Sequence, residues 1–184
     1  MKRVLSYSDF MKICEDKSGS MYEYGCLMLY VKIPNWSEFT NQIQSSYLYE
    51  PQNERYVLET EPHITILYGI HKDVKDEDVL ETFSGINEKE FDLKLVGIDC
   101  FKNKDYDVLK INVKSEKLNE LNNIAKSLPH TDTYPDYKPH LTIAYLKKGF
   151  GDMYSNKDFE TSAVNLDKIV YSKTNGEKIS IPLQ

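Results

Sequence analysis

Apolar and polar residues follow two spacings along this chain, one typical of strands and the other of helices. Apolar residues three and four positions apart predict short helices at 7–14 and 76–83, and two more after the N-cap residues Asn35 and Ser115. Apolar runs or strict alternation predict strands at 25–33, 91–101, 106–113, 164–171 and 178–183. We expect 91–101 and 106–113 to form a hairpin with one solvated face. Asn175-Gly176 predicts a tight turn between the last two strands.

Two further strands carry nearly the same phrase. It reads Glu-Pro-His-Ile-Thr-Ile-Leu-Tyr-Gly at 61–69 and Lys-Pro-His-Leu-Thr-Ile-Ala-Tyr-Leu at 138–146. Side chains alternate between the two faces of a strand, so His63 and Thr65 share one face, as do His140 and Thr142. If the two strands lie side by side, two imidazoles and two hydroxyls converge on one place. The repetition is more specific than either His-x-Thr alone, because histidine and threonine are individually common in strands.

The order of the predicted elements suggests the fold class. Each half of the chain contains a strand, a helix and then a His-x-Thr strand. We therefore expect an α+β protein with two pseudo-symmetric lobes of antiparallel sheet, helices outside and a central cleft. No low-complexity linker divides the chain, so 1–184 is expected to be a single bilobal domain. Residues 1–20 are an N-terminal extension that could act as a lid.

The residue types of the repeated phrase suit general acid-base cleavage of a phosphodiester. One neutral imidazole can accept a proton from the attacking oxygen, while a protonated one donates a proton to the leaving oxygen. Mutual repulsion would separate the titrations of His63 and His140. Thr65 and Thr142 could donate hydrogen bonds to the non-bridging phosphate oxygens as charge develops. This chemistry needs neither a metal nor a cofactor. His71 and His130 lack ligand spacing and are expected in loops.

Composition limits the partners. The net charge is −6 with 23 Lys and Arg residues, which disfavours long nucleic acid but permits a small nucleotide. The longest apolar run, at 26–31, is too short to span a bilayer. We expect a cytoplasmic monomer. Cys14, Cys26 and Cys100 are expected to be free thiols because they are odd in number and lack metal-ligand spacing.

The paired His-x-Thr strands and the two-lobed order of elements resemble the 2H phosphoesterase superfamily, from about Gly25 to the C-terminal hairpin. The resemblance implies a bilobal α+β fold and metal-free action on RNA ends, 2′,3′-cyclic phosphates, 2′-5′ linkages or cyclic nucleotides. It also implies that His63 and His140 are the acid-base pair and that Thr65 and Thr142 contact the phosphate.

Within that superfamily, the phrases at 24–30, 61–69 and 137–145 look most similar to the phage anti-CBASS nucleases. This resemblance implies cleavage of 3′-5′ bonds in cyclic di- or trinucleotides, such as 3′,3′-cGAMP or cyclic tri-adenylate, through attack by the neighbouring 2′-hydroxyl. It would place a phage-encoded protein in the cytoplasm of an infected bacterial host, where it counteracts CBASS immunity. Two alternatives stay open: an RNA-end enzyme resembling the 2′-5′ RNA ligases, and a non-catalytic cyclic-nucleotide sponge.

Base recognition is less well defined by the sequence. The family uses aromatic residues to hold a base, and Tyr22 and Tyr24 are the candidates here, although ordinary strand-entry aromatics are equally compatible with the pattern. Lys138 is a candidate for positive potential beside His140, against the alternative of a solvated lysine. Trp36 is expected in the core, so no tryptophan clamp is assigned.

Overall fold

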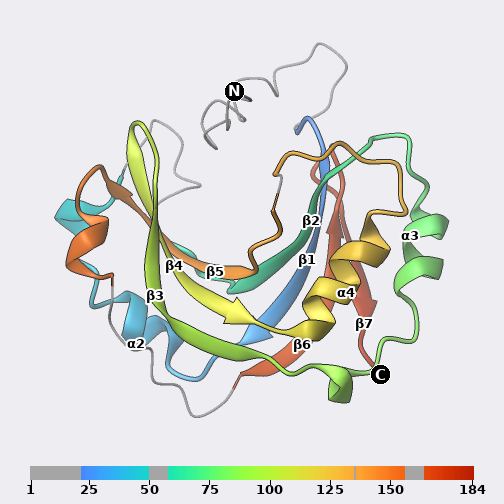
Figure 1. The fold of residues 1–184 in the computed structure, drawn as a ribbon, viewed down its shortest axis with the longest axis horizontal. Helices are drawn as coiled ribbons and strands as arrows, with labels where there is room; N and C mark the ends of the chain where they lie inside the picture. Colours follow the sequence, from blue (N-terminus) through green and yellow to red (C-terminus); the bar gives the residue numbers. More distant parts are fainter. Residues whose placement is uncertain (1–21, 50–57, 135, 156–163) are drawn as a thin grey trace.

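The computed structural model describes residues 22–49, 58–134, 136–155 and 164–184. Its central feature is a seven-stranded antiparallel sheet with the strand order β3-β4-β5-β2-β1-β6-β7 (Figure 1). The strands are β1 (Gly25–Lys32), β2 (His63–Ile70), β3 (Lys94–Lys102), β4 (Tyr106–Lys114), β5 (His140–Lys147), β6 (Asn165–Ser172) and β7 (Lys178–Pro182). The expected α+β class with antiparallel strands is confirmed.

Few helices accompany the sheet. They are α2 (Trp36–Thr40), α3 (Asp76–Phe83) and α4 (Glu116–Ala125), with short 3-10 turns η1 (Ser45–Tyr47), η3 (Glu88–Glu90) and η4 (Gly151–Met153). Figure 1 shows α3 and α4 together at one side of the molecule and α2 at the other. Within the described segments, no helix is both long and apolar enough to cross a membrane. The helix expected at 7–14 and the extension at 1–20 lie outside the described residues.

Two predicted elements differ in detail from the structure. The strand expected from residue 91 begins at Lys94, since the chain leaves the 3-10 turn η3 at Glu90 and has no regular structure over 91–93. Asn35 does precede α2, but its φ of 61° places it in the left-handed region and its side chain makes no capping bond. The backbone therefore turns tightly at Asn35, shortly after the end of β1.

The two halves of the molecule meet in one continuous sheet. One half contains β3, β4 and β5, and the other contains β2, β1, β6 and β7. Pairing within each half extends along most of each strand. Between the halves, β2 and β5 share a single registered pair, Ile64 with Leu141. The two predicted lobes are thus joined through the centre of the repeated phrase.

A row of fully buried side chains lies beneath this junction. Leu29 pairs with Ile64, which pairs with Leu141, which in turn pairs with Ile111. All four residues are 0% exposed. Alternation along the strands then sends the neighbouring His and Thr side chains to the opposite face. The core therefore fixes the face on which the polar residues of both phrases lie.

Each His strand also contains a β-bulge directly after its threonine. Ile66 is the extra residue in the pairing of β2 with β1, and Ile143 is the extra residue in the pairing of β5 with β4. The backbone carbonyls of these two isoleucines accept hydrogen bonds from outside the paired strands. Ile66 O accepts from Asn122 Nδ2 at 2.7 Å, and Ile143 O accepts from Glu59 N at 2.9 Å. Bulges bend a strand and increase its local twist. The two phrases are therefore alike in backbone shape as well as in sequence.

The N-terminus of α4 is capped as the sequence predicts. Ser115 Oγ accepts from Leu118 N at 3.2 Å and donates to Asp92 Oδ1 at 2.7 Å. We expect Ser115→Ala to lower the free energy of unfolding by about 1–2 kcal/mol, because both contacts are lost. Urea denaturation followed by circular dichroism would measure this. The exposed Ser84→Ala is the control, and an equal effect of the two substitutions would contradict the capping role.

Candidate active site

The two His-x-Thr pairs lie on adjacent strands of the sheet. Ile64 pairs with Leu141 in antiparallel register, so His63 lies beside Thr142, and Thr65 lies beside His140. All four residues are partly exposed, whereas Ile64 and Leu141 between them are buried. The structure therefore brings together the four residues that the sequence selected. Their catalytic roles remain predictions.

The backbone fixes the tautomer of both histidines. His63 Nδ1 lies 2.9 Å from Glu61 O, and His140 Nδ1 lies 2.8 Å from Lys138 O. A carbonyl oxygen can only accept, so Nδ1 must be the protonated nitrogen in each ring. The Nε2 atoms are then the ones that gain or lose a proton. Both imidazoles are thus prepared for acid-base chemistry at Nε2.

The same contact occurs a third time in the chain. His130 Nδ1 lies 2.8 Å from Leu128 O, and again a proline separates the two residues. Proline fixes its own φ and keeps the preceding residue extended. The X-Pro-His sequence therefore favours this ring orientation wherever it occurs. What distinguishes His63 and His140 from His130 is the facing His-x-Thr strand.

The surroundings of the two histidines differ in charge. Glu59 Oε2 lies 3.8 Å from His63 Nδ1, an ion pair that forms when His63 is protonated. On the other side, desolvation by burial is the main cause that lowers the pKa of His140 from its usual 6.5, and the positive charges of Lys110 and His63 lower it further. The site thus favours a neutral imidazole at His140.

This pKa shift has a consequence for stability. In the interval between the lowered pKa of His140 and 6.5, the unfolded chain binds more protons than the folded one, so the free energy of unfolding should rise with pH. Urea denaturation at a series of pH values from about 5 to 8 would measure the rise. His140→Gln should flatten it, and an unchanged pH dependence in this variant would contradict the interpretation.

Aromatic rings border both histidines. Tyr30 stacks on His63 with ring centroids 5.4 Å apart, and Phe101 meets His140 edge to face at 5.0 Å. Lys178 Nζ donates to the Tyr30 hydroxyl at 3.2 Å. These contacts restrict the rotation of both imidazoles, in addition to the backbone hydrogen bonds.

Further side chains constrain the first threonine. The Cys26 thiol is a hydrogen-bond partner of the Thr65 side chain, and desolvation raises the pKa of this thiol to about 12. The thiol therefore stays protonated near neutral pH. Tyr137 Oη donates to the backbone carbonyl of Thr65 at 3.1 Å. Cys26 and Cys100 are free thiols, as expected, and Cys14 lies outside the described residues.

The sequence did not identify Lys110 as part of this site. We expected the strand at 106–113 to have one solvated face, but β4 is buried on both faces, and Lys110 is only 3% exposed. Lys110 pairs in register with Thr142, and Asn112 pairs with His140. A buried cation therefore lies on the neighbouring strand, on the same face as the His-x-Thr residues.

The predicted base-contacting residues lie at different places. Tyr24 packs edge to face on Tyr68 at 5.8 Å and lies 6.2 Å from the ring of His71. Tyr22 N donates to Thr174 O at 2.8 Å. The Lys138 side chain is exposed, while its carbonyl orients His140. The role of both tyrosines in binding a base stays a prediction.

Three other predictions concern residues outside the site. Trp36 is 7% exposed and part of the core, as expected. His71 lies in the loop after β2 and contacts Thr131 Oγ1 at 2.9 Å, whereas His130 forms an isolated bridge with Ile70. Among the described residues, no group of three or more His, Cys, Asp or Glu side chains has the geometry of a metal site.

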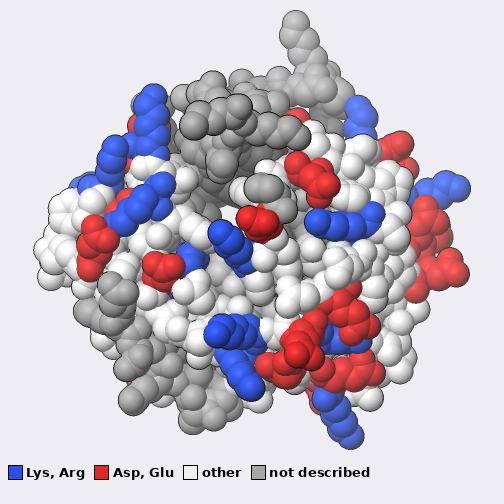
Figure 2. All heavy atoms as spheres, in the orientation of Figure 1, with Lys and Arg blue, Asp and Glu red and all other residues white. Residues whose placement is uncertain are grey.

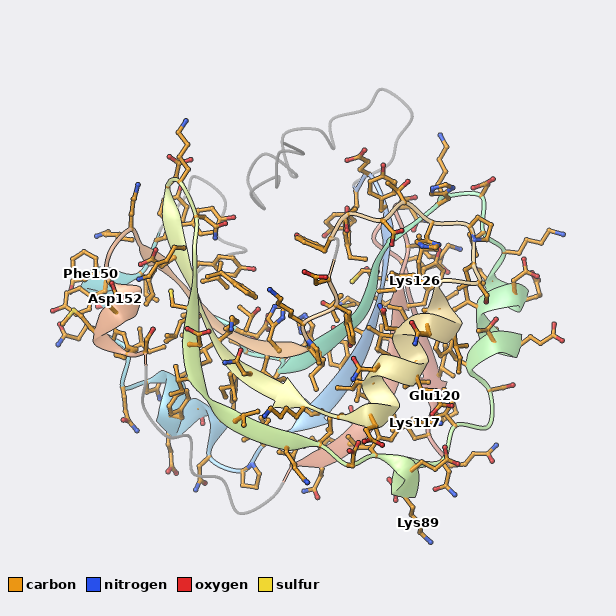
Figure 3. The ribbon with its side chains drawn as sticks, viewed as in Figure 1. Lys89, Lys117, Glu120, Lys126, Phe150 and Asp152 are labelled. Carbon is orange, nitrogen blue, oxygen red and sulfur yellow. The ribbon has the colours of Figure 1, made fainter. Side chains whose placement is uncertain are left out.

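An open pocket lies at the start of α4. It is lined by Glu90, Asp92, Glu116, Lys117 and Glu120 and contains none of the His-x-Thr residues. Lys117 is already paired there with Glu90 at 2.7 Å and Glu120 at 3.2 Å. Figure 3 shows Lys117 and Glu120 projecting from α4, at the opposite side of the molecule from Phe150 and Asp152. This pocket is therefore separate from the candidate active site.

Comparison with known proteins identifies the family. Residues 33–149 match the model of the 2′-5′ RNA ligase superfamily. Among solved structures, a protein described as a phosphoesterase is 16% identical, with a TM-score of 0.47 over 86% of this chain and 95% of that one. E. coli LigT complexed with 3′-AMP is 16% identical, with a TM-score of 0.48 over 88% and 97% of the two chains. LigT complexed with NADP+ is 18% identical, with a TM-score of 0.44 over 88% and 96%. No curated protein matches the sequence.

Proposed function

Because this chain belongs to the 2′-5′ RNA ligase superfamily, we propose that it is a metal-independent phosphodiesterase that uses His63 and His140 as its acid-base pair. The observation that carries the proposal is the pairing of Ile64 with Leu141, which sets two His-x-Thr motifs side by side on one face. In both rings Nδ1 donates a hydrogen bond to a backbone carbonyl, so Nε2 is the nitrogen that can exchange a proton. Two such groups suffice for both proton transfers of phosphodiester cleavage.

The proposed direction of proton transfer rests on the charges around the two rings. His140 is the base, because its pKa is lowered by burial and by neighbouring positive charge. His63 is the acid, because Glu59 forms an ion pair with its protonated ring. In the reaction, His140 Nε2 takes the proton of a 2′-hydroxyl as the bond from O2′ to phosphorus forms. The bond from phosphorus to O5′ breaks, and His63 Nε2 gives its proton to O5′. The products are a 2′,3′-cyclic phosphate and a 5′-hydroxyl.

The threonines stabilise the phosphate during this step. Thr142 lies beside His63, and Thr65 lies beside His140, so a phosphate above the pair of Ile64 and Leu141 has a hydroxyl on each side. Hydroxyl donors aimed at non-bridging oxygens gain strength as negative charge develops there. Cys26 and Tyr137 hold Thr65 through its side chain and its backbone carbonyl.

The proposed substrate is a cyclic di- or trinucleotide, as the resemblance to the anti-CBASS nucleases implies. A net charge of −6 is compatible with a small nucleotide. Figure 2 shows Lys and Arg interspersed with Asp and Glu over the face that it presents. A surface on which positive and negative side chains are interspersed is more compatible with a compact ligand than with a long polyanion. On this proposal, a phage-encoded copy would remove the alarm nucleotide of its host.

A substrate panel with product analysis tests the proposal. Purified protein is incubated with 3′,3′-cGAMP or cyclic tri-adenylate in excess EDTA, and products are identified by mass spectrometry. We expect full turnover in EDTA and a linear product ending in a 2′,3′-cyclic phosphate. Loss of turnover in EDTA would overturn the metal-free mechanism. Recovery of intact ligand from heat-denatured protein would indicate a sponge.

The family match favours one alternative, an enzyme that processes RNA ends. The same acid-base pair would open a terminal 2′,3′-cyclic phosphate or cleave a 2′-5′ linkage. Both substrates belong in the panel. A higher kcat/KM on either of them than on the cyclic dinucleotides would replace the proposed substrate while leaving the roles of His63 and His140 in place.

A further inference from the structure

Lys110 is a buried charged side chain on the strand beside the predicted base, and the mechanism above gives it no role. Its ammonium lies 3.1 Å from Asp99 Oδ2, contacts Asn112 Oδ1, and lies 4.4 Å from the centroid of the Phe101 ring. Phe101 in turn packs edge to face on His140. Lys110 is therefore held in one position by β3 and β4 and connected to His140 through packed side chains.

Burial of this cation requires an explanation. An ammonium group loses hydration when it is buried, and a partner charge offsets only part of that loss. Asp99, the partner, is 55% exposed in its side chain, so its negative charge is screened by solvent more than the positive charge of Lys110. The charge of Lys110, on the strand beside Thr142 and His140, is therefore less screened by solvent than the charge of its partner.

We propose that Lys110 is a positioning residue whose buried charge, together with the burial of the imidazole itself, favours the neutral His140 that the base of the pair requires. This inference rests on the proposed function, because it assigns a direction to that acid-base pair. Lys110 acts through space on the imidazole and through Phe101 on its orientation.

Charged groups act on His140 from the two strands beside it, β4 and β2, and Asp99 on β3 pairs with the first of them, Lys110. Lys110 lies on β4, Asp99 on β3 and His63 on β2, while Lys138 precedes His140 on its own chain segment. Lys138 is exposed, so its charge is largely screened. Both Lys110 and His63 lower the pKa of His140 through their charge.

The first test is an NMR titration of the imidazole carbon-bound protons, with the His140 signal assigned by comparison with His140→Gln. This readout does not depend on activity. We expect Lys110→Met to raise the pKa of His140, because a positive charge is removed. Asp99→Asn should lower it further, because Lys110 loses its counter-charge. Lys110→Arg should leave it near the wild-type value. The exposed Lys114→Met, at the end of the same strand, controls for a general change in net charge.

The second test measures turnover as a function of pH on whichever substrate of the panel is cleaved. We expect Lys110→Met to lose on the order of tenfold in kcat/KM below neutral pH and to recover at higher pH, where His140 is neutral again. An equal loss at every pH would indicate a structural defect and would overturn the proposal.

The two tests separate the possible failures. If no substrate is cleaved, the proposed function fails, while the NMR titration still decides whether Lys110 controls the protonation of His140. An unchanged His140 titration in folded Lys110→Met would overturn the inference. Should that variant not fold, Asp99→Asn decides, and an unchanged or raised pKa of His140 in it would overturn the inference equally.

Discussion

Replacing either His63 or His140 by alanine is expected to lower kcat on the cleaved substrate by about a hundredfold or more. On the proposed mechanism each residue supplies one of two proton transfers, and loss of a positioned acid or base typically costs this much. Both side chains are partly exposed at the surface of the sheet, so the variants should remain folded. Steady-state kinetics with a denaturation curve for each variant would measure both expectations.

His130→Ala is a matched control for these substitutions. It removes an imidazole whose Nδ1 makes the same contact with the carbonyl two residues earlier. His130 lies next to Ile70 at the far end of β2, away from the pair of Ile64 and Leu141. We expect nearly normal turnover from it. The double variant of His63 and His140 should be little worse than either single one, since the two act as a unit. Near-normal activity in either single variant would refute the assigned chemistry.

Ile64→Ala is expected to lower the free energy of unfolding by about 2–5 kcal/mol. Ile64 is 0% exposed and forms the single registered pair that joins the two halves of the sheet. Its truncation removes buried apolar contacts and leaves a cavity between Leu29 and Leu141. Because His63 and Thr65 are its immediate neighbours, turnover should fall as well, even at temperatures where the variant is folded.

Chemical denaturation of Ile64→Ala beside Val96→Ala tests this expectation. Val96 is also a strand residue, but it is 45% exposed, so its truncation should change stability by only about 0.5 kcal/mol. If the two variants lost similar free energies of unfolding, the pair of Ile64 and Leu141 would contribute no more to stability than an exposed strand residue does.

The part of the fold that alternation governs could be predicted from the sequence. His63 and Thr65 share a face because side chains alternate between the two faces of a strand. The apolar residues between and after them indicate which face is buried. The repeated phrase made it reasonable to expect β2 and β5 as neighbours. Ser115 was identifiable as an N-cap because serine before a helical pattern has a specific local role.

Other features depend on partners distant in the sequence. Lys110 stands in a strand with polar neighbours, a pattern typical of a solvated face, and only the approach of Asp99 and Asn112 explains its burial. The bulges at Ile66 and Ile143 depend on donors from Asn122 and Glu59, which local spacing does not reveal. Long-range contacts of this kind override local propensity.

The single pair of Ile64 and Leu141 has a mechanical consequence. Each half of the sheet contributes one imidazole and one hydroxyl, so neither half alone can enclose a phosphate. Any sliding of one half against the other displaces the two imidazoles, and with them the proposed acid and base, relative to each other. The precision of the site is therefore set by the stiffness of the apolar layer beneath it. Substitutions in that layer should act as catalytic mutations although they never touch the nucleotide.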